Sequence, residues 1–279
     1  MEWFEAIILG LIQGLTEFLP VSSSGHLIIG KELLGIELNE DLTFELVVHA
    51  ATVLSTIVIF REQIWSLLRG FFKLKNNDET DYLLKIGVSM IPVFVVGVFF
   101  KDYVESLFGS ILGVGIALLV TAVLLICSDL LTKKKSAENN IQKSASVNTQ
   151  ENVAKYRNDI SYWQAFVVGL AQAFAVVPGL SRSGSTIATG LICGIKREVI
   201  AQFSFLMVMI PILGEAFLQI VGGEIGASSI GALPLILGFI SAFLSGLLAC
   251  KAMIALVKRA KLYWFAVYCA VVAILIFIF

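Results

Sequence analysis

The sequence predicts an all-α polytopic membrane protein, an inverted-topology repeat with six transmembrane helices and two re-entrant helix–loop–helix hairpins. Three observations support this fold class. The 279 residues are 58% hydrophobic and 15% charged, with a mean hydropathy of +0.90, which lies far outside the range of soluble proteins. A segment near the N-terminus recurs in the second half of the chain. Finally, nearly all Lys and Arg residues fall on one side of the expected topology.

The repeat joins residues 5–30 (EAIILGLIQGLTEFLPVSSSGHLIIG) to residues 164–189 (QAFVVGLAQAFAVVPGLSRSGSTIAT) without a gap. In both copies an apolar run leads into a proline, a Ser/Gly-rich loop and a second, shorter apolar run. Paired, interrupted apolar segments of this kind point to a binding site in membrane proteins. The positions that match are Ala6/Ala165, Gly10/Gly169, Leu11/Leu170, Gln13/Gln172, Ser22/Ser181, Ser24/Ser183, Gly25/Gly184 and Ile28/Ile187.

The remaining apolar runs are long enough to cross a bilayer core of about 30 Å as helices. The two repeat segments are not, because Pro20 and Pro178 close their first arms and the return arms are shorter still. We therefore expect hairpins at 3–36 and 163–195, each returning to the side it came from. The predicted spans are residues 44–60, 82–100, 111–131, 201–221, 232–257 and 262–279, and the predicted hairpin arms are 3–18, 26–36, 163–177 and 185–195.

Each half then has one hairpin and three spans, and three is odd, so the second half enters the membrane upside down. The first repeat covers residues 1–132 and the second covers residues 160–279. Between them, residues 133–159 are polar and lack hydrophobic periodicity, which is typical of a flexible linker.

Positive charge predicts the orientation of the chain. Loops 61–81, 132–162, 190–200 and 251–261, together with Lys85 at a helix edge, contain seventeen of the twenty Lys and Arg residues, whereas the opposite side has only Lys31 and Lys101. The rich side should be cytoplasmic, so both termini lie outside and the first hairpin opens to the outer face. The formal net charge of −1 gives no reason to expect a nucleic-acid partner.

The first hairpin tip concentrates groups that could carry chemistry. Gln13 and Glu17 are four residues apart and share a helix face. Glu17 is the only carboxylate in the apolar part of either hairpin, which makes it a candidate general base or metal ligand. Ser22 and Ser23 supply hydroxyl groups, and His26 lies in the return helix. The alternative hypothesis, that the serines only cap that helix, explains neither Glu17 nor His26.

The second tip has the parts of an anion-binding cradle. An arginine between serines precedes a glycine and the start of a helix, where backbone N–H groups, hydroxyl groups and a guanidinium favour phosphate. The candidate residues are Ser181, Arg182, Ser183 and Thr186. The alternative is a buried Glu17–Arg182 ion pair that only holds the two halves together, although an apolar pair would do so without the desolvation cost.

Other polar residues in apolar runs allow two interpretations each. His49, in the first full span, either lines a cavity together with Glu45 or is a core histidine with its hydrogen bonds satisfied. Glu215 is a lone carboxylate well inside a span, which is compatible with a cavity role. Asp129 lies near a helix end, where we expect it to be solvated.

At the two tips the chain resembles the undecaprenyl-diphosphate phosphatase family, also called the BacA-type bacitracin resistance proteins. The resemblance is carried by GLTEFLPVSSSGH (14–26) and PGLSRSGSTIATG (178–190) and extends over essentially the whole chain. The family's first motif, Glu or Gln followed four residues later by Glu, falls on Gln13 and Glu17. This chain therefore has one carboxylate where some relatives have two.

The resemblance implies an enzyme of the bacterial cell membrane that removes the terminal phosphate of a C55 polyprenyl diphosphate and recycles the lipid carrier for cell-wall synthesis. It also implies a divalent cation, Mg²⁺ or Ca²⁺, with Glu17 as a ligand or as the base. The diphosphate would be held by Arg182, Gln13, Ser22, Ser181, Ser183 and Thr186. His26 is expected to be the nucleophile or an acid, with Ser23 as the rival nucleophile, and direct attack by water is left open.

A competing hypothesis is a lipid-phosphate flippase or anion transporter, because inverted repeats with interrupted helices are the usual architecture of transporters. Such a protein would use the same cradle. Convergence of a carboxylate, a hydroxyl group and a histidine beside an arginine favours chemistry over transport. The sequence leaves open whether the chain forms a homo-oligomer.

Overall fold

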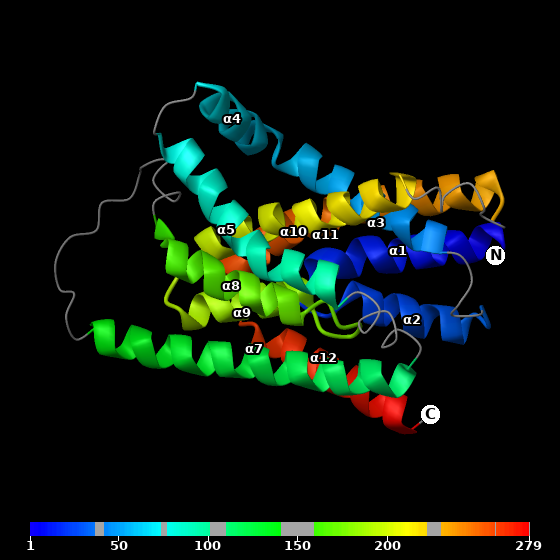
Figure 1. Ribbon diagram of the computed structural model, residues 1–279. Coiled ribbons are helices and arrows are strands. Elements are labelled where there is room, and N and C mark those ends of the chain that lie inside the picture. The colour runs from blue at the N-terminus through cyan, green and yellow to red at the C-terminus, as the bar shows by residue number, and fades with distance from the viewer. Residues whose placement is uncertain are drawn as a thin grey trace.

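A computed structural model of the chain describes residues 1–36, 42–73, 77–100, 110–140, 159–221, 230–259 and 261–278. These residues form eleven helices and no strand (Figure 1). The helices are α1 (Trp3–Phe18), α2 (Ser23–Leu33), α3 (Leu42–Ile59), α4 (Arg61–Phe72), α5 (Asp78–Phe99), α7 (Ile111–Asn140), α8 (Tyr162–Phe174), α9 (Arg182–Ile192), α10 (Arg197–Val221), α11 (Ala232–Arg259) and α12 (Tyr263–Ile278).

The described part of the chain is all-helical, and its apolar helices are those of a multi-pass membrane protein. Among the described helices, α5, α7, α10 and α11 contain stretches long and apolar enough to cross a bilayer. The pair α3 and α4 would supply a fifth span if the two helices were one interrupted span, but they are bent by 79° at their break. Helix α12 is apolar but only 16 residues long.

The short arms of the predicted hairpins correspond to helices in the structure. The arms predicted at 3–18 and 163–177 are α1 and α8, and the return arms are α2 and α9. Both returns have 11 residues, and each begins several residues earlier than expected because a serine caps it.

Two predicted loops are partly helical in the structure. The loop predicted at 61–81 contains the whole of α4, because its apolar residues recur at helical spacing within a segment of low mean hydropathy. The linker predicted to begin at residue 133 is still part of α7 up to Asn140. Extending a helix adds one hydrogen bond per residue ordered, and Lys, Ala and Glu are good helix formers. The rest of the predicted linker, residues 141–158, lies outside the described residues.

Glycines let the first arm of each hairpin approach a long helix from the other half of the chain. A Cβ atom on Gly10 of α1 would lie 2.5 Å from the carbonyl oxygen of Gly238 in α11. A Cβ atom on the matching Gly169 of α8 would lie 2.2 Å from the carbonyl oxygen of Ser89 in α5. Both distances are far below van der Waals contact, so these helix pairs depend on glycine, as close helix packing in membranes often does.

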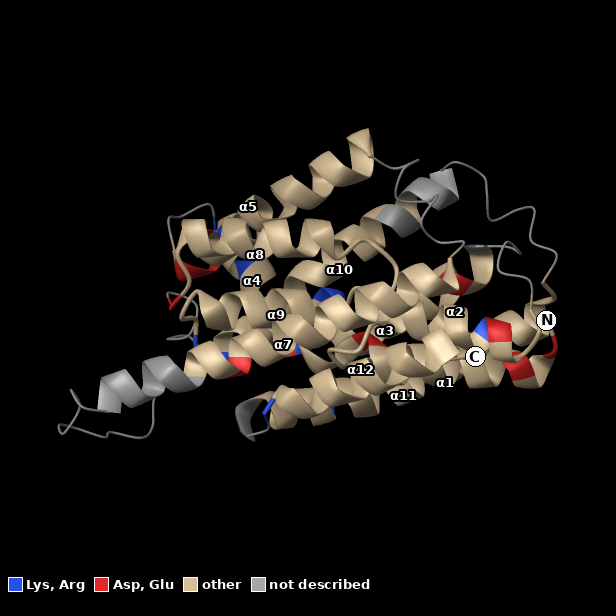
Figure 2. Cartoon of the chain, turned by 90° about the horizontal axis from the view of Figure 1, so that it is seen from below, with Lys and Arg blue, Asp and Glu red and all other residues tan. Residues whose placement is uncertain are grey.

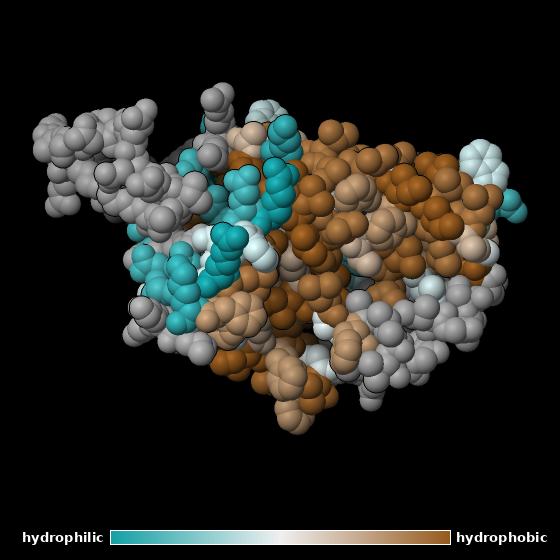
Figure 3. Space-filling view, turned by 90° about the horizontal axis from the view of Figure 1, so that it is seen from above, coloured by the Kyte–Doolittle hydropathy of each residue, from teal (hydrophilic) through white to brown (hydrophobic). Residues whose placement is uncertain are grey.

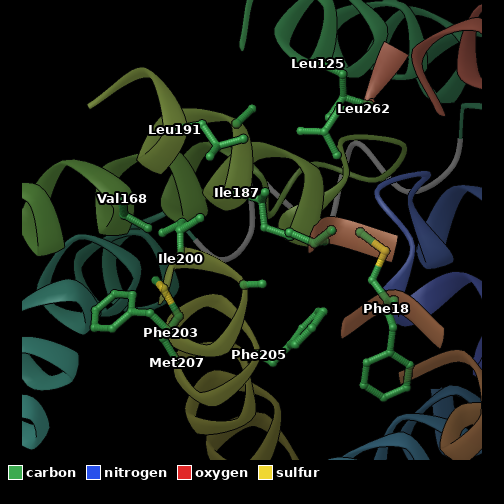
Figure 4. Close-up of a cluster of buried hydrophobic side chains, with 14 of the residues drawn as sticks. Phe18, Leu125, Val168, Ile187, Leu191, Ile200, Phe203, Phe205, Met207 and Leu262 are labelled. Carbon is green, nitrogen blue, oxygen red and sulfur yellow. The ribbon is translucent and has the colours of Figure 1, made fainter. Parts of the chain in front are cut away.

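A large buried cluster of hydrophobic side chains joins the two halves (Figure 4). Phe18, at the end of α1, packs edge-on against Phe205 of α10, with ring centroids 5.8 Å apart. Tyr82 of α5 packs in the same way against Phe203 of α10. Helix α10 is therefore at the centre of the core and fixes the end of α1 where the first tip begins.

Charged residues gather toward the two ends of the helix bundle, with few in its middle (Figure 2). Asp129 is one of the buried charges, with 5% of its surface exposed, so the prediction that it is solvated is wrong. It accepts hydrogen bonds from Arg197 of α10 at 2.9 Å and from the backbone N–H of Tyr263 at 2.9 Å. These partners, distant in sequence, bring α7, α10 and the start of α12 together.

The close contact at Gly169 predicts a large difference between two Gly→Ala variants. Gly169→Ala should lower the free energy of unfolding by about 1–3 kcal/mol, the usual cost of overpacking, because the rigid Ser89 backbone occupies the space of the new methyl group. Gly87→Ala in α5, where no atom lies within 4 Å of the new Cβ, is the control and should be neutral or stabilising. Thermal unfolding in detergent measures both. Equal midpoints would contradict the proposed packing.

Candidate active site

Each tip is a short break between two helices, and a serine caps the second helix. Ser22 caps α2 by accepting a hydrogen bond from the backbone N–H of Gly25 at 3.3 Å, and Ser181 caps α9 by accepting one from Gly184 at 3.0 Å. Ser22 has a φ angle of +70°, a left-handed conformation that is costly for a residue other than glycine. The capping role expected for the serines is therefore present, together with backbone strain at the first tip.

The two tips contact each other directly. The hydroxyl group of Ser183 donates a hydrogen bond to the carbonyl oxygen of Leu19 at 3.0 Å. A Cβ atom on Gly25 would lie 3.1 Å from the Cα atom of Gly179. The backbone N–H of Ser181 donates to the hydroxyl oxygen of Thr121 in α7 at 3.1 Å. The structure thus brings together two segments that are about 160 residues apart in sequence.

The carboxylate of Glu17 is the centre of this contact. Its Oε2 atom accepts hydrogen bonds from the Gln13 amide at 2.8 Å and from the Ser23 hydroxyl group at 2.5 Å. Its Oε1 atom faces the Arg182 guanidinium at 3.4 Å. The Glu17 side chain is 7% exposed, whereas that of Arg182 is 22% exposed, so the arginine is the more accessible partner.

His49 of α3 also approaches this carboxylate. Its Nε2 atom lies 3.9 Å from Oε2 of Glu17. Its Nδ1 atom lies 2.7 Å from the carbonyl oxygen of Glu45, and a carbonyl can only accept, so Nδ1 carries the hydrogen. The Glu45 side chain accepts a hydrogen bond from the buried Lys31 at 2.6 Å. His49 therefore lies close to the site carboxylate, but neither His49 nor Glu45 is among the residues that line the pocket.

A pocket opens beside the Glu17 carboxylate, and the N-terminal residues of α2 and α9 both line it. One wall is polar and the other, formed mostly by α10, is apolar. The polar lining residues are Glu17, Ser22, Ser23, Ser24, Thr52, Thr56, Ser181, Arg182 and Ser183, and the apolar ones are Phe18, Val53, Leu180, Phe205, Val208, Met209 and Ile212. Two helix N-termini directed at one pocket favour a multiply charged anion there.

Three of the predicted site residues lie outside this lining. Gln13 is fully buried behind Glu17. Thr186 is buried behind Arg182, where its hydroxyl group meets that of Ser204 in α10 at 2.5 Å. His26 lies 2.8 Å from the carbonyl oxygen of Ser22 through Nδ1 and 2.8 Å from the Tyr268 hydroxyl group through Nε2. The two rings of this last pair are stacked, with centroids 5.5 Å apart.

Several residues of the site could not be found in the sequence. Thr52 and Thr56 of α3 and the apolar residues of α10 resemble any other residues of an apolar helix, and only packing places them on the pocket. Tyr268 of α12 is 242 positions from its partner His26. Glu215 lies in α10, but its side chain is outside the described part of the structure.

The residues at the first tip fit a divalent cation of the oxygen-binding type. Glu17 offers a carboxylate and Ser23 a hydroxyl oxygen, and the Oε1 atom of Gln13 is buried without a hydrogen-bond partner among the described residues. The described residues contain no group of three or more His, Cys, Asp or Glu side chains that could hold a metal ion, so the protein would supply only part of the coordination shell. This donor set suits Mg²⁺, which commonly takes one or two carboxylates and completes its shell with phosphates and water.

Comparison with known proteins agrees with this geometry. The model of the family described as "Bacitracin resistance protein BacA" matches residues 6–275. The chain belongs to this family. It is 55% identical over 278 residues to an undecaprenyl-diphosphatase of Bacteroides fragilis, covering 98% of this chain and 97% of the relative. It is 52% identical to the protein of that name in Bacteroides thetaiotaomicron, covering 100% and 99%, and 46% identical to one in Christiangramia forsetii, covering 100% and 98%.

The BacA match includes both tips and every residue that lines the pocket. The resemblance seen in the two tip motifs is therefore confirmed over most of the chain. Because the match also covers α3 and α10, it includes the walls of the pocket as well as its polar centre.

Proposed function

We propose that the chain is an integral membrane phosphatase that hydrolyses undecaprenyl diphosphate to undecaprenyl phosphate and inorganic phosphate, which returns the lipid carrier to cell-wall synthesis. The observation that carries the proposal is the hydrogen bond from Ser23 to Glu17 in a pocket that Arg182 and two helix N-termini make favourable to anions. The names of the relatives, undecaprenyl-diphosphatase, support the same substrate.

The two walls of the pocket suit the two parts of this substrate. Arg182, Ser181 and Ser183 and the first backbone N–H groups of α9 would hold the diphosphate. Phe205, Met209 and the other apolar residues of α10 would contact the first isoprene units of the tail. Phosphoryl transfer needs mainly positioning and neutralisation of the phosphoryl oxygens, and both are available here.

Ser23 is the nucleophile in this proposal and Glu17 is its base. Glu17 takes the proton of the Ser23 hydroxyl group, and the oxygen attacks the terminal phosphorus atom. The bond from that phosphorus to the bridging oxygen breaks, leaving undecaprenyl phosphate and a phosphoserine. Glu17 then loses this proton to solvent as undecaprenyl phosphate departs. A water molecule attacks the phosphorus atom of the phosphoserine and gives one proton to Glu17. The bond from phosphorus to the Ser23 oxygen breaks, Glu17 passes the proton to that oxygen, and inorganic phosphate is released.

His26 is assigned a positioning role, because both of its ring nitrogens have partners and its ring does not line the pocket. Its Nδ1–H group donates to the carbonyl of Ser22 and so stabilises the strained residue that precedes Ser23. A general acid is not needed at neutral pH, because the leaving group is a phosphate whose second pKa is about 6.

A divalent cation, Mg²⁺ or Ca²⁺, would be held by Glu17 with the amide oxygen of Gln13 and the phosphate oxygens. Its contribution when bound is to neutralise charge on the diphosphate. The support is the oxygen donor set and the buried, unpartnered Oε1 atom of Gln13.

We further propose the complete architecture: six spans, two re-entrant hairpins and inverted repeats at 1–132 and 160–279, joined by a linker within 133–159. Reciprocal packing supports this arrangement. Helix α1 packs on α11 and α8 packs on α5, so the first arm of each hairpin contacts a long helix of the other half. The matched residues Gly10 and Gly169 make these two contacts.

The site is proposed to open to the outer face of the cell membrane, with both termini outside. The two termini lie at the same end of the helix bundle (Figures 1 and 2), as three spans in each half require, and the charge distribution supports this orientation. A homo-oligomer is not needed, because one chain supplies every residue of the pocket. A flippase would need the same cradle but no base bonded to a hydroxyl group.

The function is tested by phosphate release from undecaprenyl diphosphate, using purified protein in detergent, where no transport can occur. The wild type should release phosphate, and Glu17→Gln should reduce kcat by about 10²–10⁴-fold, the usual effect of losing a general base. Glu32→Gln, an exposed carboxylate in α2, is the control and should keep the full rate. Release by Glu17→Gln at more than about a tenth of the wild-type rate would contradict the assigned base.

Arg182→Lys should be severely impaired in the same assay. A guanidinium can donate to two phosphate oxygens at once, which an ammonium group cannot copy. We expect kcat/KM to fall at least about tenfold, or about 1.4 kcal/mol of transition-state stabilisation. The control is Arg61→Lys in α4, where the arginine side chain is 71% exposed.

Near-normal kinetics for Arg182→Lys would support the competing hypothesis, in which the Glu17–Arg182 pair only joins the two halves. That hypothesis also predicts a lower thermal unfolding midpoint for Arg182→Ala with little change in substrate affinity. A large rise in KM at an unchanged midpoint would instead support phosphate binding.

The proposed orientation is tested by labelling single cysteines in intact cells, after replacement of the four native cysteines. Ser110→Cys, before α7, should react with a membrane-impermeant thiol reagent, and Lys261→Cys, before α12, should react only after permeabilisation. Both positions are exposed in the structure, so neither should be protected by the protein. The opposite pattern would place the pocket opening on the cytoplasmic face.

A further inference from the structure

Helix α4 has an exposed apolar stripe that no other described element covers. Trp65, Leu68 and Phe72 follow one another at spacings of three and four residues and so lie on one face. They are 55%, 42% and 75% exposed. Phe71, beside this stripe, is 46% exposed. Exposed aromatic and apolar residues are expected where a helix meets lipid, but α4 differs from the spans because it also carries polar residues and a face that is attached to the protein.

The opposite face of α4 is attached to α5. Leu67 is buried, and a Cβ atom on Gly70 would lie 2.3 Å from the Cβ atom of Glu79. The Asn77 side chain, which caps α5, donates a hydrogen bond to the carbonyl oxygen of Gly70 at 3.0 Å. The orientation of the apolar stripe is therefore fixed by the contacts between α4 and α5.

Basic side chains border the stripe. Arg69 and Lys73 line a surface pocket together with Trp65, Ser66, Gly70 and two acidic residues, Glu62 and Glu79. The Arg69 guanidinium lies over the ring of Trp65, 4.8 Å from its centroid. From Arg61 to Lys73 the segment carries three basic residues and one acidic residue. Figure 3 shows hydrophilic residues gathered at one end of the face seen from above, beside a wide hydrophobic surface.

The direction of α4 matches its pattern of residues. It follows α3 directly and is bent from it by 79°. If α3 crosses the membrane, α4 then lies nearly in the membrane plane. A short helix in that position with aromatic residues on one side and Lys or Arg on the other has the features of an interfacial helix.

We propose that α4 lies in the membrane–water interface and binds anionic lipid headgroups through Arg69 and Lys73. Trp65, Leu68 and Phe72 insert into the boundary between headgroups and acyl chains. The partner is the phosphate of an anionic phospholipid, because basic residues beside an inserted apolar stripe complement its charge and its tail together. The proposal concerns a surface remote from the Glu17 pocket and does not depend on the reaction.

Depth is tested with a protein in which Trp65 is the only tryptophan. Trp3, Trp163 and Trp264, all more than half exposed, are replaced by phenylalanine, and the protein is placed in phosphatidylcholine vesicles. Lipids brominated near the headgroup should quench Trp65 more strongly than lipids brominated near the chain ends. Stronger quenching by the deep bromines would mean that α3 and α4 form one span, and no quenching would mean that α4 lies in water. Either result overturns the proposal.

Headgroup selectivity is tested in the same protein with brominated phosphatidylglycerol in phosphatidylcholine. We expect a preference for phosphatidylglycerol of about fivefold or more, because a basic residue near an anionic surface contributes about fivefold. Arg69→Gln with Lys73→Gln should abolish the preference. Lys251→Gln with Lys261→Gln, which removes two exposed charges elsewhere, should keep it. Two results would overturn the role of Arg69 and Lys73. One is equal quenching by both lipids in the protein that retains Arg69 and Lys73. The other is loss of the preference in the Lys251→Gln, Lys261→Gln variant.

Discussion

Two breaks in helices lie against each other inside a membrane protein, and their backbone groups must find partners there because lipid offers none. The structure satisfies them with hydroxyl groups. Ser22 and Ser181 cap the helices that follow the breaks, Ser183 donates to the carbonyl of Leu19, and Thr121 accepts from the backbone of Ser181. These hydroxyl groups form a small polar pocket between apolar helices. The residues that satisfy the backbone at the two breaks therefore also form the candidate active site.

The pocket can hold a buried carboxylate only because donors surround it. An isolated ionised carboxylate in an apolar environment would be very costly, and Glu17 has Gln13, Ser23 and Arg182 around it. The contact with Arg182, at 3.4 Å, is longer than the 2.7–2.9 Å typical of strong charge-assisted hydrogen bonds. The guanidinium of Arg182 thus lies near the Glu17 carboxylate without a strong hydrogen bond to it. Such a guanidinium keeps donors free for phosphate.

The repeat supplies two similar backbones with different chemistry. In the alignment of the two copies, Glu17 corresponds to Val176, Ser23 to Arg182 and His26 to Ser185, while Ser22 and Ser181 keep the same capping role. One tip therefore provides a carboxylate and a hydroxyl group, and the other provides a cation. Neither tip alone could hold a diphosphate beside a base, so the function depends on their contact.

Much of the fold could be predicted from the sequence because hydropathy and capping are local properties. The runs that became α5, α7, α10 and α11, the short hairpin arms, the capping serines and the two tip motifs were all recognisable. Helix α4 was not predicted, because the low mean hydropathy of its segment conceals the amphipathic pattern of its residues. The last turns of α7 were not predicted either. Burial of Asp129 was predicted wrongly because its partners, Arg197 and Tyr263, come from distant parts of the chain.

The sequence by itself determined which residues could act as base, hydroxyl and cation, because these types are rare in apolar segments. Only the tertiary structure decided which of them meet. In the structure Ser23, rather than His26, is hydrogen-bonded to the Glu17 carboxylate. His49 lies 3.9 Å from that carboxylate, and His26 is hydrogen-bonded to Tyr268 instead. These contacts depend on helices packed closely through Gly10 and Gly169 and around α10. Packing joins residues at any sequence separation, and spacing along a single chain does not encode it.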